Sequence, residues 1–147
     1  MDSLGQRVAA KKKEMRKELD EKLVKEFPLL FKDRHASEMK TAMCWGFDCG
    51  DGWYFLIHHL CSTIQGRIDS NPHMKLPQPT VFQVKEKFGS LRFYVDFADD
   101  ETRGMIWLAE HMSAYICEKC GKEGRIIYER GWYRCRCYSC WKKERKV

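Results

Sequence analysis

Residues 117–121 read Cys-Glu-Lys-Cys-Gly and residues 137–140 read Cys-Tyr-Ser-Cys, so two C-x2-C pairs are separated by sixteen residues. Two thiolate pairs at this spacing are what a tetrahedral structural zinc site needs. The predicted ligands of one structural Zn²⁺ are Cys117, Cys120, Cys137 and Cys140. A site closed by four sulfurs has no open coordination position, so it holds a fold together and does no chemistry itself.

The elements around these pairs predict the kind of zinc module. Gly121 allows the backbone to turn toward the first pair of sulfurs, as in a zinc knuckle. Residues 125–128 and 132–136 are predicted to form two short strands, and residues 141–146 a short helix after the second pair. A knuckle, a hairpin and a helix in that order resemble a treble-clef zinc finger more than a zinc ribbon. We therefore assign residues 117–147 to a treble-clef-like zinc module.

Other interpretations of these cysteines remain open. Cys135 and Cys137 form a C-x-C pair, so Cys135 is an alternative ligand to Cys137, although the spacing favours Cys135 as a spectator. Disulfides or an iron–sulfur pair are weaker alternatives in a chain predicted to stay in the cytosol. A His-metal nuclease, which shares the treble-clef form, is disfavoured because no histidine follows His111.

A second, irregular group of metal-ligand residue types lies earlier in the chain. It comprises Cys44, Cys49, His58, His59 and Cys61. Cys61 lies on an apolar helical stripe, where a buried free Cys behaves as a small hydrophobic residue. His58 and His59 are adjacent on a predicted helix and point about 100° apart, so they do not readily share one metal. We expect structural roles here, with a second zinc site as the alternative.

Residues 1–116 are predicted to form an α+β body in which helices pack on a small antiparallel hairpin. Apolar residues at helical spacing predict helices over 3–27, 52–68 and 100–116. The stripes are Leu4, Val8, Met15, Leu19 and Leu23 in the first helix; Trp53, Leu56, Ile57, Leu60, Ile64 and Ile68 in the second; and Met105, Leu108, Met112 and Tyr115 or Ile116 in the third.

The ends of these helices carry capping and turn signals. Ser3 and Asp51 are expected to cap the first two helices, Asp99 or Asp100 is expected to cap the third, and Pro28 ends the first. Residues 45–53, which are dense in Gly, Asp and aromatic residues, predict a tight and specific turn.

A β-hairpin is predicted over 81–97, with its turn at residues 88–90. Alternation places Phe82, Val84, Leu91, Phe93, Val95 and Phe97 on the core face, and Gln83, Lys85, Lys87, Arg92 and Tyr94 on the other. Cations on facing strands lie within reach of one phosphate or carboxylate, so Lys85, Lys87, Arg92 and Tyr94 are candidate phosphate-binding residues. An ordinary solvent-facing surface is the alternative.

The net charge of +6 is concentrated in the zinc module. Residues 117–147 contain ten Lys and Arg against four Glu, whereas the charges of residues 1–116 cancel. A basic module is compatible with phosphate or an acidic partner, or with a solubilising role.

Aromatic side chains alternate with these cations, which suits stacking on bases together with phosphate contacts. The aromatics are Trp132, Tyr133, Tyr138 and Trp141, and the cations are Arg130, Arg134, Arg136, Lys142 and Lys143. Because so small a module needs its own core, we expect at least two of the four aromatics to be buried.

Three blocks together resemble a family of small tailed-bacteriophage and prophage proteins. They are Cys49-Gly50-Asp51-Gly52-Trp53, Gln83 to Gly89 with Leu91 to Tyr94, and the Cys117 to Cys140 module. The resemblance covers about residues 40–140. It implies an accessory protein acting in the bacterial cytoplasm and implies no particular activity. Cys135, Cys44 and Cys61 lie outside the pattern.

The residues favour binding over catalysis, because no spacing specifies a reaction. We predict a nucleic-acid-binding accessory or regulatory protein, with a host-directed inhibitor of a bacterial enzyme or defence protein as the first alternative. A nucleotide-binding protein or an enzyme using the hairpin cations is the second alternative. The absence of an apolar run of about 18 residues argues against a membrane span, and the first ten residues lack a signal-peptide apolar region.

Overall fold

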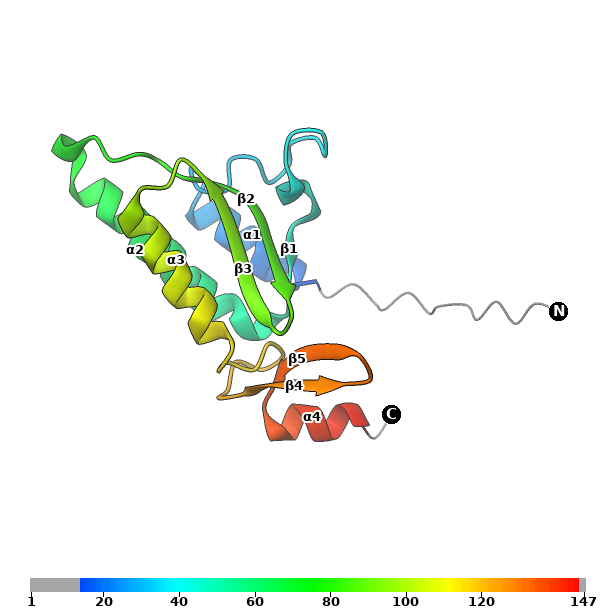
Figure 1. The fold of residues 1–147 in the computed structure, drawn as a ribbon. Coiled ribbons are helices and arrows are strands. Elements are labelled where there is room, and N and C mark those ends of the chain that lie inside the picture. The colour runs from blue at the N-terminus through cyan, green and yellow to red at the C-terminus, as the bar shows by residue number, and fades with distance from the viewer. Residues whose placement is uncertain (1–13, 146–147) are drawn as a thin grey trace.

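The computed structural model describes residues 14–145 and has the predicted α+β architecture (Figure 1). Its four α-helices are α1 (Lys17–Glu26), α2 (Tyr54–Ser70), α3 (Asp100–Ser113) and α4 (Tyr138–Arg145). Its strands are β1 (Phe47–Asp48), β2 (Thr80–Lys87), β3 (Ser90–Asp96), β4 (Arg125–Glu129) and β5 (Trp132–Arg136). Short 3-10 helices span Ala42–Trp45, Asp51–Trp53 and Pro72–Met74.

The body is built on a three-stranded sheet in the order β1-β2-β3. The β2–β3 hairpin is antiparallel, as predicted, and β1 pairs with β2 in parallel, which places Asp48 beside Lys85. The parallel strand is too short to be recognised from alternation. It adds a carboxylate to the sheet face that carries the predicted cations.

The core lies between this sheet and helices α1, α2 and α3. The predicted stripe of α2 is confirmed, since Trp53, Leu56, Ile57, Leu60 and Ile64 are buried and Ile68 is partly buried against the core. Other core residues are Leu23, Leu30, Phe31, Met43, Phe47, Val81, Val84, Leu91 and Phe93.

The first helix is shorter than predicted in the part of the chain that the structure describes. It begins at Lys17, and the chain leaves it at Phe27, just before Pro28. Met15 precedes the helix and is buried beside Phe47, whose carbonyl accepts a hydrogen bond from the Met15 N–H. The predicted cap Ser3 and the stripe residues Leu4 and Val8 lie outside the described residues.

The predicted stripe of α3 is correct only in part. Met105 and Ile116 are partly buried against the core, whereas Leu108, Met112 and Tyr115 are exposed. The fully buried residues of the helix are instead Thr102, Ile106, Ala109 and Ser113. Small side chains at Ala109 and Ser113 let the helix approach β3 closely, and the Ser113 hydroxyl accepts a hydrogen bond from the Leu91 N–H at 2.8 Å. The spacing of apolar residues does not predict this hydrogen-bonded contact between α3 and β3. The helix also ends at Ser113, before the predicted residue 116.

Two hairpin residues do not lie on the predicted core face. A β-bulge between Val81 and Gln83 turns Phe82 outward, where its ring stacks on Tyr94 at 5.8 Å between centroids. A bulge shifts the two-residue alternation by one position. Phe97 follows the end of β3 in a left-handed conformation and is exposed.

The predicted cap of α2 is also corrected. Asp51 accepts two hydrogen bonds from Arg16, from its backbone N–H at 2.8 Å and from Nε at 2.7 Å, and so joins α1 to the start of α2. By contrast, Asp99 caps α3 as expected, because its carboxylate accepts a hydrogen bond from the Thr102 N–H.

No helix between residues 14 and 145 combines the length and apolarity that crossing a membrane requires.

Candidate metal centre and binding surfaces

Four cysteine sulfurs converge at one end of the molecule. The Sγ atoms of Cys117, Cys120, Cys137 and Cys140 all lie within 4.8 Å of one another, and those of Cys120 and Cys137 are 3.6 Å apart. Zinc–sulfur bonds of about 2.3 Å in a tetrahedron place the sulfurs about 3.8 Å apart. The donor set and its spacing therefore fit one metal ion, and a soft all-thiolate set suits zinc.

Local backbone structure brings the two pairs together. Gly121 has φ of 81°, and its N–H donates to the Cys117 carbonyl at 2.9 Å, which closes the predicted knuckle. The β4–β5 hairpin then returns the chain to the second pair, with Gly131 at positive φ in its turn. Cys137 directly precedes α4 and Cys140 lies in its first turn. The order is that of a treble clef, as predicted.

The backbone at the start of α4 favours the thiolate form of Cys137 over its thiol form. The Cys140 N–H donates to the Cys137 sulfur at 3.4 Å, and this hydrogen bond lowers the pKa of Cys137 to about 7. Burial raises the pKa of Cys140 to about 12 and also raises the pKa of Cys120. A metal ion bound among the sulfurs reverses this rise in pKa, because metal coordination deprotonates a thiol.

Cys135 does not belong to this group of sulfurs. Its thiol points toward the carbonyls of Ile116 and Ala114, at 3.0 and 3.4 Å. The side chain is buried, and burial raises its pKa to about 11. A protonated thiol with a carbonyl acceptor matches the predicted spectator role.

The second group of candidate ligands forms no metal cluster in the described residues, where the four cysteines above are the single group found. Cys49 and Cys61 are buried, and burial raises the pKa of both thiols. His58 lies 2.9 Å from a Glu26 carboxylate oxygen and against the Phe27 ring. These contacts agree with the structural roles that we expected.

The knuckle is seated on the glycine-rich turn that precedes α2. The Gly52 N–H donates to the Glu118 carbonyl at 2.7 Å, and the Gly50 N–H donates to the Glu118 carboxylate at 2.9 Å. The Trp53 indole donates to the Ile116 carbonyl at 2.8 Å. A Cβ at either glycine would overlap the knuckle backbone. Sequence reasoning recognised a specific turn here, but not its role as the seat of the zinc knuckle.

Two predicted nucleic-acid contacts have partners inside the module. Arg136 is buried and pairs with Glu118 at 3.4 Å and Glu144 at 2.8 Å. Arg134 pairs with Glu129 and Glu144, each at 3.1 Å. These two arginines connect α4 to the β4–β5 hairpin and to the knuckle, so we remove them from the candidate binding surface.

The module's aromatic side chains are more exposed than expected. None of Trp132, Tyr133, Tyr138 and Trp141 is buried, and Trp141 is half-buried with its indole N–H donating to Glu129 at 3.0 Å. The expectation of two buried aromatics was wrong because the buried centre of the module consists of cysteines and the Glu118–Arg136 pair. Lys142, Lys143 and Arg130 are exposed.

The predicted polar face of the body hairpin is present. Register places Gln83 opposite Tyr94 and Lys85 opposite Arg92, and Lys87 follows on the same face. Among the described residues, Lys85, Lys87 and Arg92 form no ion pair. Arg92 instead donates to the Ser90 hydroxyl at 2.7 Å.

The turn of this hairpin contacts the zinc module. Figure 1 shows the β2–β3 turn directed at the β4–β5 hairpin. Phe88 packs edge-on against Tyr133, with ring centroids 6.1 Å apart. The ring centroids of Tyr133 and Tyr128 are 4.7 Å apart. The Lys87 ammonium lies 5.5 Å from the Phe88 ring centroid. Cations and exposed aromatics thus form one continuous surface across body and module.

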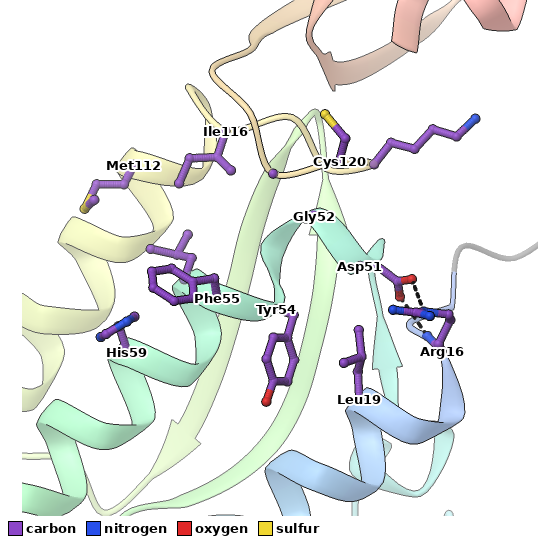
Figure 2. A pocket seen from close by; sticks show the side chains of 13 residues that line it. Arg16, Leu19, Asp51, Gly52, Tyr54, Phe55, His59, Met112, Ile116 and Cys120 are labelled. Atoms are coloured by element: carbon purple, nitrogen blue, oxygen red, sulfur yellow. Dashed lines mark hydrogen bonds and ion pairs between the residues drawn. The ribbon is translucent and has the colours of Figure 1, made fainter.

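A pocket of about 860 Å³ lies between α1, α2, α3 and the knuckle. Figure 2 shows Leu19, Phe55, Met112 and Ile116 around it, with the Arg16–Asp51 pair at one side. Its walls are mainly apolar, and its ionisable lining residues include Arg16, Asp51, His59, Lys119 and Cys120.

Comparison of the chain with known protein families, with curated proteins and with solved structures found no match.

Proposed function

We propose that this protein is an accessory or regulatory protein that binds single-stranded nucleic acid, with its C-terminal module stabilised by one structural zinc ion. The observation that carries the proposal is the surface formed by the body hairpin and the module hairpin together. We call it the hairpin surface, and it comprises Lys85, Lys87, Phe88, Arg92, Tyr94, Tyr128 and Tyr133.

The aromatic part of the hairpin surface supports base stacking. Phe88 and Tyr128 are each 63% exposed, and Tyr133 is 44% exposed. Exposed rings next to one another are available to successive unpaired bases, and each stacked base contributes about 1–3 kcal/mol. Bases inside a duplex do not present their faces in this way, so the surface suits single strands better than double strands.

The cationic part supports contact with the phosphate backbone. Lys85 and Arg92 lie opposite each other on neighbouring strands, and Lys87 lies between them and the aromatic rings. Cations without carboxylate partners gain more from a phosphate than cations already in ion pairs. Arg134 and Arg136 are excluded by this criterion, whereas Arg130, Lys142 and Lys143 on the module remain secondary candidates.

The test is fluorescence anisotropy of labelled single-stranded DNA and RNA and of duplex DNA, titrated with zinc-loaded protein at two salt concentrations. We expect single strands to bind at least as tightly as duplex, with affinity falling as salt rises. Lys85→Glu combined with Lys87→Glu should reduce the salt dependence. Tyr128→Ala combined with Tyr133→Ala should weaken binding about tenfold or more at either salt concentration.

The matched control is Lys22→Glu combined with Lys25→Glu, which introduces the same change of charge on the exposed side of α1. It should leave the affinity within about twofold, because distant charges are screened at physiological salt. Binding unaffected by the hairpin changes would contradict the proposed surface. Absence of binding at low salt would favour the alternative partner, a bacterial host protein, which pull-down from lysate would identify. The phage accessory role inferred by resemblance remains a prediction.

A further inference from the structure

The outward side of α2 and α3 carries large apolar side chains without a covering element in the described residues. Phe55 is 71% exposed, Trp107 77%, Leu108 59% and Tyr115 58%, and Met112 is also exposed. We call these five residues the α3 face. Contiguous apolar surface of this kind marks an interaction site more often than it occurs by chance.

The α3 face has the spacing of a helix-packing surface. Gly104, Leu108, His111 and Tyr115 follow one another at intervals of four, three and four residues, with Trp107 alongside. This is the pattern that packs one helix against another. The α3 helix has 14 residues, so the surface is about 21 Å long.

Gly104 lies in the N-terminal half of α3, in line with Leu108, and offers room for a close approach. A Cβ at Gly104 would meet no atom within 4 Å, so nothing in the protomer requires a glycine there. A glycine inside a helix is unfavourable relative to alanine. Its absent side chain leaves a hollow opposite which a bulky side chain of a second helix can pack.

The net charges at the two ends of the α3 face are opposite in sign. At the N-terminal end, Asp100 is fully exposed and lies 3.2 Å from Arg103, and the adjacent Glu101 lies 2.9 Å from Arg67. With Asp99, three carboxylates accompany two arginines at this end. At the C-terminal end, the Gly124 N–H donates to the Tyr115 carbonyl at 2.9 Å, which brings the exposed Lys122, Glu123 and Arg125 to this end, where two cations accompany one acid. An antiparallel helix of the same sequence would therefore place acidic residues beside basic ones at both ends.

We propose that the α3 face binds a second copy of this chain, with the two α3 helices antiparallel about a two-fold axis. In this arrangement Gly104 of each copy faces the bulky half of the other helix, which contains His111 and Tyr115. The face also continues into the pocket of Figure 2, because Phe55 and Met112 line both, so the apolar contact extends beyond a single helix.

The experiment is sedimentation equilibrium of the zinc-loaded full chain over about 1–100 µM. We expect the mass to rise from the 17.5 kDa of one chain toward twice that value. Gly104→Lys and Leu108→Lys should each weaken dimerisation at least about tenfold. Both positions are exposed, and lysine is a good helix former, so circular dichroism should show an intact fold.

Met39→Lys is the matched control, since Met39 is 92% exposed and lies outside the α3 face. It should leave the dimer unchanged. A wild-type chain that stays monomeric throughout would overturn the proposal and assign the face to a partner of different sequence. A dimer that persists in both α3 variants would overturn it as well. Nucleic-acid binding is measured separately, so either proposal can fail without the other.

Discussion

At the residue scale, the four cysteines and Cys135 have different surroundings although they lie close together in the sequence. Four sulfurs face one another, and the fifth faces two backbone carbonyls. The difference arises from the β4–β5 hairpin, whose alternation directs Cys135 toward the body, opposite Ile126.

Replacing single cysteines tests this assignment. Cys117→Ser or Cys140→Ser should release the metal and unfold the module, because serine is a poor zinc ligand and the binding energy of a structural zinc is folding energy. Cys135→Ser should keep one zinc per chain, since a hydroxyl also donates to the Ile116 carbonyl. Metal content is measured by inductively coupled plasma mass spectrometry. Metal loss in Cys135→Ser alone would reverse the choice of ligands.

Gly52 provides a second residue-scale test. A Cβ at Gly52 would overlap the backbone carbonyls of Cys117 and Glu118, so Gly52→Ala should destabilise the protein by about 1–3 kcal/mol or more. The matched control is Gly66→Ala in α2, where a Cβ meets nothing within 4 Å. That change should stabilise the protein by about 0.5–1 kcal/mol. Urea unfolding measures the stability of both variants. Equal changes in the free energy of unfolding would argue against close contact between Gly52 and the knuckle backbone.

At the element scale, α3 is held at its N-terminus by Asp99. The Asp99 carboxylate accepts hydrogen bonds from the Arg67 guanidinium, at 2.9 and 3.1 Å, and from the Thr102 N–H. These bonds lower the pKa of Asp99 to about 2, with the Arg67 hydrogen bond as the largest cause. The contact therefore joins α2 to α3 and caps α3 at the same time.

A pH dependence follows from this shift. The folded pKa of Asp99 lies below its ordinary value of 3.8, so its stabilising contribution is complete above about pH 4 and declines as pH falls toward 2. Asp99→Asn keeps a capping side chain but does not titrate. The stability difference between wild type and Asp99→Asn in urea unfolding should shrink across this interval. A side-chain carboxyl titration by NMR near 3.8 would contradict the assignment.

Several elements could be predicted from the sequence, and the errors have identifiable causes. The α2 stripe and the body hairpin were recognised because apolar periodicity there reports directly on burial. The α3 stripe was wrong at Leu108 and Met112 because small and polar residues, Ala109 and Ser113, make the contact with the sheet. The position of Phe82 was wrong because a bulge leaves no clear trace in local composition.

At the scale of the whole molecule, the zinc module and the body share hydrogen bonds across the predicted boundary between residues 116 and 117. Gly50, Gly52 and Trp53 all donate to residues of the knuckle or to Ile116 before it. The knuckle carries Cys117 and Cys120, so a metal ion bound by the four sulfurs would fix its shape. Loss of the metal should therefore weaken the hydrogen bonds at the start of α2.

Chelation tests this coupling. Removing the proposed metal ion with a chelator should increase amide hydrogen exchange at Gly50 and Gly52, in addition to the module itself, because their acceptors on Glu118 would lose their fixed position. Exchange in the centre of α2, around Leu60, serves as the internal control and should change much less. Exchange increased only within residues 117–145 would show that the two parts fold independently.

The local sequence by itself determined the four-cysteine group, the order of knuckle, hairpin and helix, and the body hairpin. These features depend on short-range spacing, alternation and turn residues, which can be recognised from the sequence alone. Tertiary structure alone decided that Arg134 and Arg136 pair internally, that the glycine turn at Gly50 and Gly52 seats the knuckle, and that Leu108 and Met112 of α3 face outward. Ion pairing, close backbone approach and helix rotation all depend on residues distant in sequence, so no local pattern specifies them.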